Sequence, residues 1–219
     1  MNKLLKLISA GFFPERCPYC DKTIAAGKIA CDICEAQFPE TYSSNYAKGG
    51  YPCCSPFFYQ GIFKEAVKRF KFNNMPQNAE KLATVLSLCV KKSYDIKSID
   101  IITFVPMFPA KEAVRGYNQS RLLAIELSKI LGIPCENIIE KIKDNFPQHE
   151  CTSQAQRRDN VKGVYKAADT ENIKGKKVLI IDDILTTGYT LGECCKVIAK
   201  KTKAEVLCAT ICAKNDIYT

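Results

Sequence analysis

The stretch that decides the fold is Val178-Leu-Ile-Ile-Asp-Asp-Ile-Leu-Thr-Thr-Gly-Tyr-Thr190. Its four apolar residues, 178–181, predict a buried strand of a parallel sheet. Two carboxylates, Asp182 and Asp183, follow at the position where we expect this strand to end. A short loop rich in threonine and glycine, 186–190, then leads into a helix that we expect to begin near Leu191. The order strand, acid pair, hydroxyl-rich turn and helix indicates a site for a phosphorylated sugar.

Each part of this stretch has a chemical use at such a site. Backbone N–H groups of the turn and the partial positive charge of the helix start favour a bound phosphate. Gly188 permits a left-handed backbone that comes close to the phosphate, and threonine hydroxyls supply further donors. The carboxylates accept hydrogen bonds from ribose hydroxyls and are suited to a hydrated Mg²⁺. The predicted phosphate-binding residues are Thr186, Thr187, Gly188, Tyr189 and Thr190, and the predicted catalytic residues are Asp182 and Asp183.

At these residues the chain resembles the type I phosphoribosyltransferases, whose fingerprint binds phosphoribosyl pyrophosphate. Two other interpretations of the stretch compete with this one. An apolar strand ending in two aspartates is also typical of P-loop NTPases, but their G-x-x-x-x-G-K-[ST] loop is absent, because Lys177 follows Gly175-Lys176 and Thr170 stands where the first glycine should be. The other is an ordinary strand-to-helix turn capped by threonine.

Charge and cysteine content limit the classes of protein. The net charge of +9 and pI near 8.9 suit anionic partners such as phosphates, nucleotides or nucleic acid, without choosing among them. The chain has thirteen cysteines, but several lie in apolar stretches, where cysteine is usually a small buried hydrophobe. We find no secretory signal in residues 1–10 and no transmembrane stretch, so we expect a cytoplasmic protein without membrane insertion, in which clustered thiols favour a metal.

Four cysteines form a CxxC…CxxC set, Cys17, Cys20, Cys31 and Cys34, with ten residues between the pairs. Two residues inside each pair let both thiolates reach one metal from a tight turn, and two such turns complete a tetrahedral site. We therefore predict a structural zinc ion; spare thiols or a redox pair are the alternatives. Cys53 and Cys54 stay unassigned, since adjacent cysteines rarely ligate one ion.

Two further segments carry candidate phosphate ligands. Lys111 and Arg115 follow a second predicted strand, 99–105, at the end of a parallel strand where ligands bind; a surface charge before a helix explains them equally well. A long polar segment with weak periodicity, 141–162, predicts a loop, and we expect its Arg157 to close over a bound pyrophosphate. The lone His149 lacks a visible partner and receives no assigned role.

Strands alternate with helices from about residue 57 onward, which implies a parallel sheet with right-handed crossovers. We expect residues 1–50 to form a cysteine-rich, zinc-ribbon-like module with a linker at 43–50, and residues 51–219 to form an α/β domain. By its resemblance, this domain is a type I phosphoribosyltransferase-like parallel sheet flanked by helices.

The whole pattern resembles the ComF family, in which a zinc module precedes a phosphoribosyltransferase-like domain. The resemblance rests on the four-cysteine set, on residues 67–72, 105–119 and 148–163, and on the stretch 178–190. It implies a link to competence, the uptake and use of external DNA. It also implies structural zinc, and Mg²⁺ with phosphoribosyl pyrophosphate.

Two functions remain in competition. The first is an enzyme that transfers a phosphoribosyl group to an unidentified nitrogen acceptor, with Lys111, Arg115 and Arg157 meeting the departing pyrophosphate. The second is a non-catalytic protein that senses phosphoribosyl pyrophosphate or a nucleotide. In that case the basic surface and the zinc module would contact single-stranded DNA or a DNA-uptake helicase.

Overall fold

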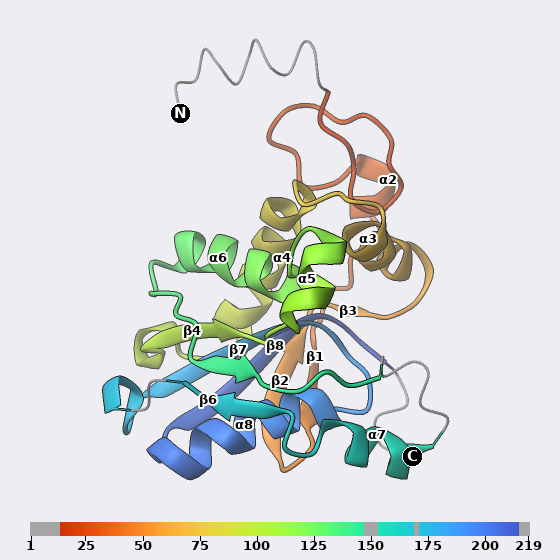
Figure 1. The fold of residues 1–219 in the computed structure, drawn as a ribbon. Helices are drawn as coiled ribbons and strands as arrows, with labels where there is room; N and C mark the ends of the chain where they lie inside the picture. Colours follow the sequence, from red (N-terminus) through yellow and green to blue (C-terminus); the bar gives the residue numbers. More distant parts are fainter. Residues whose placement is uncertain (1–13, 147–152, 169–170, 215–219) are drawn as a thin grey trace.

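The computed structural model describes residues 14–146, 153–168 and 171–214 (Figure 1). Its main sheet has the strand order β1-β2-β8-β7-β4, and a short strand, β3, also pairs with β8. All neighbours are parallel except β1 and β2, which form an antiparallel hairpin. The strands of this sheet are β1 (Ser43–Ala47), β2 (Tyr51–Ser55), β3 (Phe57–Phe58), β4 (Ile101–Phe104), β7 (Lys177–Leu185) and β8 (Glu205–Ala213).

Helices cover both faces of this sheet. Figure 1 shows α3, α4, α5 and α6 above it, and α8 with the small antiparallel pair β5 and β6 below it. The remaining elements are α2 (Asp32–Glu35), α3 (Gly61–Phe72), α4 (Asn78–Ser93), η1 (Ile96–Ser98), α5 (Pro109–Arg115), α6 (Gln119–Leu131), β5 (Ile139–Lys141), α7 (Gln154–Val161), β6 (Tyr165–Ala167), η2 (Glu171–Ile173) and α8 (Tyr189–Thr202).

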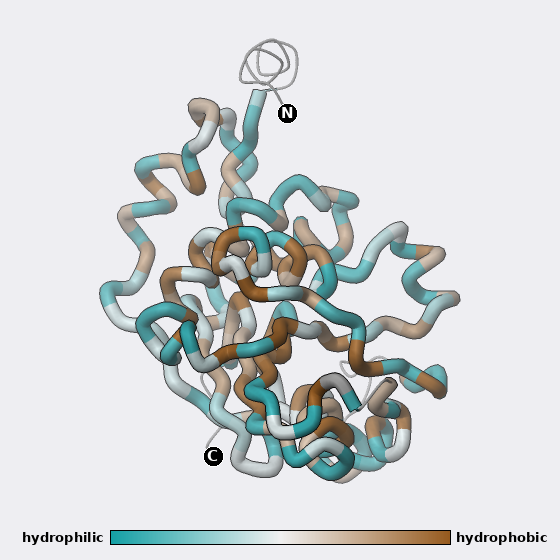
Figure 2. The backbone as a smooth tube through the Cα atoms, turned by 90° about the vertical axis from the view of Figure 1, so that its left-hand side faces the viewer, coloured by the Kyte–Doolittle hydropathy of each residue, from teal (hydrophilic) through white to brown (hydrophobic). Residues whose placement is uncertain are grey.

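The two faces of β7 belong to two hydrophobic cores. Leu179 and Ile181 pack with the helices above the sheet, whereas Val178 and Ile180 pack with α8 below it. All four are fully buried, as expected for a strand covered on both faces. Figure 2 shows the same arrangement, with hydrophobic segments in brown running through the middle of the molecule. The predicted parallel sheet flanked by helices is confirmed.

The cysteine-rich segment packs directly on the larger part of the chain. The ring of Tyr19, between Cys17 and Cys20, makes edge-on contacts with Phe57 and Phe63. Tyr19 is 1% exposed and belongs to the same core as α3 and α4. The cysteine-rich segment and the larger part of the chain therefore share one core.

Three expectations about local structure were wrong. Segment 43–50, expected to be a linker, contains strand β1, which pairs with β2 along its whole length. Strand β7 continues to Leu185, so the acid pair lies within the strand rather than after it. The polar segment 141–162 contains helix α7, begun by a capping box between Ser153 and Gln156. The boundary between two domains at residue 50 stays an expectation.

Candidate functional site

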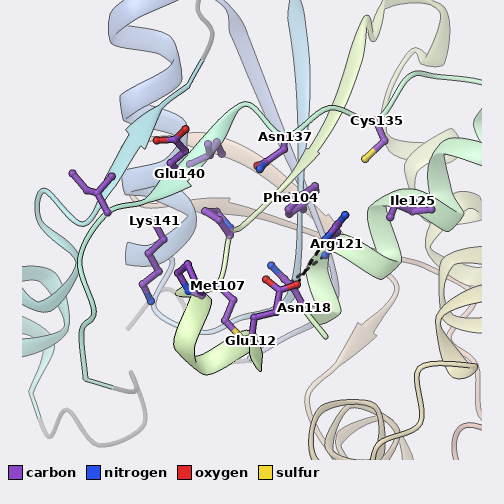
Figure 3. A pocket seen from close by; sticks show the side chains of 14 residues that line it. Phe104, Met107, Glu112, Asn118, Arg121, Ile125, Cys135, Asn137, Glu140 and Lys141 are labelled. Atoms are coloured by element: carbon purple, nitrogen blue, oxygen red, sulfur yellow. Dashed lines mark hydrogen bonds and ion pairs between the residues drawn. The ribbon is translucent and has the colours of Figure 1, made fainter. Parts of the chain in front are cut away.

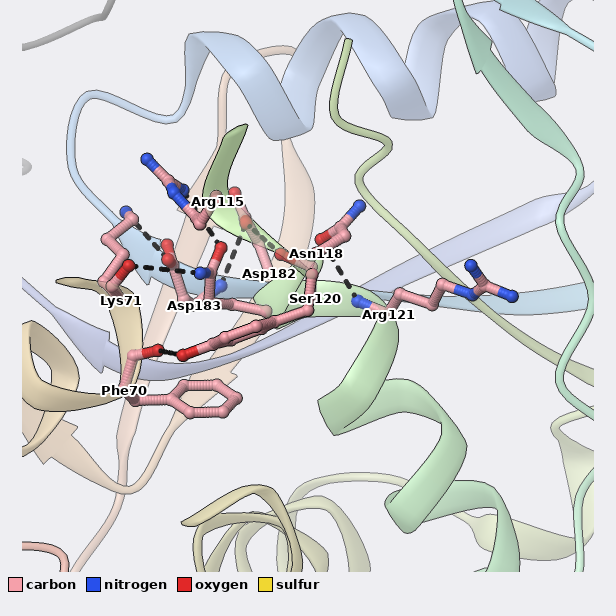
Figure 4. Close-up of polar contacts among 10 residues, drawn as sticks. Phe70, Lys71, Arg115, Asn118, Ser120, Arg121, Asp182 and Asp183 are labelled. Carbon is pink, nitrogen blue, oxygen red and sulfur yellow. Dashed lines mark hydrogen bonds and ion pairs between the residues drawn. The ribbon is translucent and has the colours of Figure 1, made fainter. Parts of the chain in front are cut away.

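The acid pair lies near the carboxyl end of β7, between the last turn of α3 and the first turn of α6 (Figure 4). The Ser120 hydroxyl, from the first turn of α6, donates to the Asp182 carboxylate at 2.8 Å. The same carboxylate accepts the Asp183 backbone N–H at 2.9 Å. Asp183 is buried, with 6% of its surface exposed. Two hydrogen bonds thus fix the Asp182 carboxylate before any ligand is bound.

Lys71, at the end of α3, is a site residue that the sequence analysis missed. Its ammonium group forms an ion pair of 2.7 Å with the Asp183 carboxylate. Burial lowers the pKa of Lys71, but Asp183 and Asp182 outweigh this effect, so the pKa is raised overall. Residues 67–72 had appeared only as one of the blocks that carry the family resemblance. Their position beside the acids depends on tertiary packing.

The surroundings of Asp182 change its ionisation. Burial, followed by repulsion from Asp183, raises the pKa of Asp182 to about 7, while Lys71 and Ser120 act in the opposite direction. A carboxyl group with this pKa is close to its titration midpoint at neutral pH. Asp182 can therefore release its proton when a cation binds next to it at neutral pH.

The threonine loop has the backbone geometry predicted for it. Gly188 adopts φ 74°, ψ 2° and precedes the first turn of α8. Thr186 and Thr187 lie in the loop, while Tyr189 and Thr190 already belong to the helix. No side chain caps this helix start. Its first N–H groups have no acceptor within the helix and are suited to a bound anion.

The turn between β1 and β2 lies against this loop. The Lys48 backbone N–H donates to the Gly188 carbonyl at 3.2 Å. A side chain at Gly188 would place its Cβ 3.0 Å from the Lys48 nitrogen, and one at Gly192 would place it only 2.2 Å from the Lys48 carbonyl oxygen. Both glycines are therefore required for close packing, and Gly188 also for its left-handed backbone.

The predicted pyrophosphate ligands of α5 differ in their surroundings. Arg115 donates to the Gln119 side chain at 3.0 Å and lies over the Phe72 ring, and Figure 4 places it near Lys71. Lys111 instead pairs with Asp144 at 2.7 Å and donates to the Asn145 carbonyl. Arg115 thus lies beside the acid pair, and Lys111 faces the start of the polar segment.

The other candidates from the polar segment are only partly placed. Arg157 lies on α7, which packs against α8, the helix that follows the threonine loop. His149 lies outside the described residues.

A cavity of about 540 Å³ lies at the carboxyl end of the edge strand β4 (Figure 3). Its polar lining includes Asn118, Arg121 and Lys141, and its apolar lining includes Phe104 and Met107. Asn118 is buried and donates to the Val105 carbonyl at 3.1 Å. Neither aspartate lines this cavity.

A second cavity, of about 500 Å³, lies beside the first turns of α8. Four cationic side chains line it together with two carboxylates, those of Asp159 and Glu193, and two tyrosines, Tyr51 and Tyr189. The cations are Lys48, Arg158, Lys162 and Lys196. The lining therefore carries an excess of positive charge next to aromatic rings.

The four predicted zinc ligands come together. The Sγ atoms of Cys17, Cys20, Cys31 and Cys34 all lie within 4.8 Å of one another, and those of Cys20 and Cys31 are 3.6 Å apart. Thiolates on a tetrahedral zinc ion, each about 2.3 Å from the metal, lie about 3.8 Å apart. The cluster therefore fits such an ion. Within the described ranges it is the one group of three or more potential ligands.

None of the helices in the described part of the chain has the length and apolar character needed to cross a membrane.

Comparison with known proteins finds relatives linked to competence and to the use of DNA. A family model described as "Phosphoribosyl transferase domain" matches residues 118–218. Competence protein F of Haemophilus influenzae is 34% identical over 145 residues, which cover 64% of this chain and 63% of that protein. DNA utilization protein YhgH of Escherichia coli K12 is 26% identical over 204 residues, covering 89% and 84%. Competence protein ComFC of Bacillus subtilis is 25% identical over 195 residues, covering 86% and 73%.

The match thus spans slightly less than two thirds of the Haemophilus relative. Among solved structures, an adenine phosphoribosyltransferase is similar with a TM-score of 0.44 and 16% identity, covering 80% of this chain and 85% of that one. The chain has a type I phosphoribosyltransferase-like fold with a four-cysteine cluster at its N-terminal side, and its sequence is similar to those of competence proteins and DNA utilization proteins.

Proposed function

We propose that the protein binds phosphoribosyl pyrophosphate with Mg²⁺ and transfers its phosphoribosyl group to a nitrogen acceptor. The observation that carries this proposal is the acid pair, held by Ser120 and Lys71 one short loop before an uncapped helix start. The 5′-phosphate would bind the N–H groups and hydroxyls of residues 186–190. The ribose hydroxyls would bind Asp182 and Asp183.

In the proposed reaction, the acceptor nitrogen forms a bond to C1 of the ribose while the bond from C1 to the pyrophosphate oxygen breaks. The acceptor loses a proton, and the electron pair leaves with pyrophosphate. Asp182 and Asp183 would stabilise positive charge that develops on the sugar. Arg115, Lys111 and Arg157 would neutralise the leaving group. Bound Mg²⁺ would supply further charge neutralisation, with the two carboxylates as its nearest hard oxygen ligands.

Zinc has a separate, structural role in this proposal. The four thiolates of Cys17, Cys20, Cys31 and Cys34 would close a site with no open position, which is typical of metals that stabilise folding rather than catalyse reactions. The site lies on the far side of α3 from the acid pair. Zinc therefore takes no part in the reaction itself.

The decisive experiment measures pyrophosphate release from phosphoribosyl pyrophosphate and Mg²⁺ in the presence of a panel of nucleobases and other nitrogen acceptors. We expect release that depends on one acceptor and disappears in Asp182→Asn. If no acceptor elicits release but the ligand still binds, the protein is a sensor rather than a transferase.

The second candidate function is binding of nucleic acid or a protein partner in the cytoplasmic part of DNA uptake. The observation that favours it is the second cavity, where cations surround two partly buried aromatic rings, those of Tyr51 and Tyr189. Such a combination suits single-stranded nucleic acid, because bases stack on aromatic rings while cations meet phosphates. Charge-removing changes at Arg158 and Lys162 should then weaken DNA binding and reduce its salt dependence. A helicase partner would be detected by co-purification that survives nuclease treatment.

A further inference from the structure

We infer that Lys71 is a positioning residue of the phosphoribosyl site and that the four-cysteine module holds it in place through helix α3. The inference rests on the proposed function, because it concerns how the same acid pair is kept ready for ligand. It assigns a role in ligand binding to a module that lies on the opposite side of this helix.

The first step is the charge balance at the acid pair. Asp182 and Asp183 are adjacent, Asp183 is buried and Asp182 is partly buried, so their charges repel each other. Lys71 is the cation in direct contact, at 2.7 Å from Asp183. Arg115, the nearby guanidinium, has no carboxylate partner among the described residues and bonds to the neutral Gln119. Removing the Lys71 ammonium group would therefore leave the Asp183 carboxylate without its ion-pair partner, so that its orientation toward a ribose hydroxyl would no longer be fixed.

The second step is the attachment of the last turn of α3. The Tyr117 hydroxyl donates to the Phe70 carbonyl at 2.5 Å, and the Gln119 side chain donates to the Lys71 carbonyl at 3.3 Å. Arg115 covers the ring of Phe72. The segment that carries the predicted pyrophosphate ligand thus also fixes the backbone that carries Lys71.

The third step is the link to the module. The Arg69 guanidinium donates to the Tyr19 carbonyl at 2.7 Å and lies 3.5 Å from the Pro18 carbonyl oxygen. Both carbonyls belong to the turn between Cys17 and Cys20. Two positions along a helix rotate the side-chain direction by about 200°. Arg69 and Lys71 therefore extend from opposite sides of α3, one toward the metal-binding turn and one toward the acids.

Aromatic packing makes this link rigid. The Tyr19 ring contacts Phe63 of α3 edge-on, and Phe63 stacks on Phe57 of β3 with centroids 4.0 Å apart. A shift of the metal-binding turn would move Tyr19, and its neighbours in α3 would have to follow, because close-packed cores transmit displacement. Helix α3 is thus clamped at its first turns by this stack and near its end by Arg69.

The same helix provides a matched control. Lys68 pairs with Glu65 at 2.9 Å on the surface, where both side chains are nearly half exposed. It has the same charge as Lys71 and lies three positions away, but it contacts neither the acids nor the module in the described structure. Changing Lys68 alters the helix charge without altering the proposed link.

The experiment compares binding of phosphoribosyl pyrophosphate with Mg²⁺ by calorimetry in the full-length zinc-loaded protein and in its variants. We expect Lys71→Met to weaken binding by about tenfold or more, Lys71→Arg to restore most of it, and Lys68→Met to match wild type. Lys71→Gln replaces Lys71→Met if the latter does not fold. Wild-type binding that persists equally in Lys71→Met and Lys68→Met would overturn the inference and leave the proposed function intact. Absence of binding by wild type would overturn both.

Two further results bear on the mechanism of positioning. If Lys71→Arg binds as weakly as Lys71→Met, the charge is not what positions Asp183, and the inference is wrong. Arg69→Met should keep wild-type zinc content, since its four thiolates are intact, yet weaken binding about threefold or more. Unchanged binding in Arg69→Met would show that the four-cysteine module does not hold Lys71 in place.

Discussion

The Ser120 hydroxyl donates a hydrogen bond of 2.8 Å to the Asp182 carboxylate and joins the first turn of α6 to strand β7. This bond favours the ionised carboxyl group, but burial and Asp183 prevail and raise the pKa of Asp182 from 3.8 to about 7. The site is therefore formed at the expense of stability, as is common for groups arranged for binding or catalysis.

A first prediction concerns stability against pH. Between pH 3.8 and about 7 the folded protein binds more protons at Asp182 than the unfolded chain does, so the stability of the ligand-free protein falls as pH rises through this window. Asp182→Asn removes the effect. We expect its Tm to exceed that of wild type by several degrees at pH 8 and to match it near pH 4. Equal differences at both pH values in thermal melts would contradict this assignment.

A second prediction concerns the ligand. Phosphoribosyl pyrophosphate with Mg²⁺ should raise the Tm, because a ligand selective for the folded state stabilises it. The rise should be larger at pH 8 than at pH 6, since the ionised Asp182 binds Mg²⁺ and ribose better. Asp182→Asn combined with Asp183→Asn should abolish the shift. A double variant that responds like wild type would place the ligand elsewhere.

A third prediction concerns zinc. We expect about one zinc ion per chain, lost in Cys17→Ser and in Cys34→Ser, as measured by elemental analysis. Cys135→Ser is the matched control, because Cys135 lies outside the four-cysteine cluster. Since Tyr19 belongs to the core shared with α3 and α4, Cys17→Ser and Cys34→Ser should also lower the Tm of the protein. Unchanged metal content in both would refute the site.

A fourth prediction concerns the glycines beneath the β1–β2 turn. Gly192→Ala gains about 1 kcal/mol of helix propensity, but its Cβ would lie 2.2 Å from the Lys48 oxygen, so the turn must move. Overpacking costs about 1–3 kcal/mol, and we expect a net loss of stability. Gly188→Val should also abolish the ligand-induced shift. Lys196→Ala, on the same helix, should neither lower stability nor abolish the ligand-induced Tm shift. A Gly192→Ala protein at least as stable as wild type would show that the turn is loosely held.

A fifth prediction separates catalysis from sensing. If an acceptor is found, Arg157→Ala should reduce kcat far more than it weakens ligand binding, because charge on the leaving pyrophosphate is greatest in the transition state. Steady-state kinetics and calorimetry on the same preparation measure the two effects. A variant with equal losses in both would assign Arg157 to ground-state binding alone.

The sequence predicted those parts of the site whose residues are close together in the chain. Asp182, Asp183 and the loop around Gly188 form one short stretch, and the cysteine pairs have a spacing that dictates their geometry. Lys71 escaped prediction because its ion pair joins distant elements, and only the packing of α3 on the module and on Tyr117 brings them together.

Local structure was missed where its signal was weak. Helix α7 has a capping box at Ser153 and Gln156, but Val161 is its only buried residue, so no apolar period revealed it. Strand β1 is a polar edge strand, SSNYA, and its composition is that of a linker. Strands β5 and β6 have only three residues each, too few for an alternating pattern to be recognised.

The position of β8 in the sheet has a consequence for synthesis on the ribosome. This strand follows every other described strand in the chain, yet it lies between β2 and β7, and its Thr210 bonds to Ser55 across 155 positions. While the chain emerges, the cysteine module can take up its metal at once, whereas β2 and β7 have no partner between them. We expect the nascent chain to expose both strand edges until β8 leaves the exit tunnel, a window in which chaperone binding would protect it from aggregation.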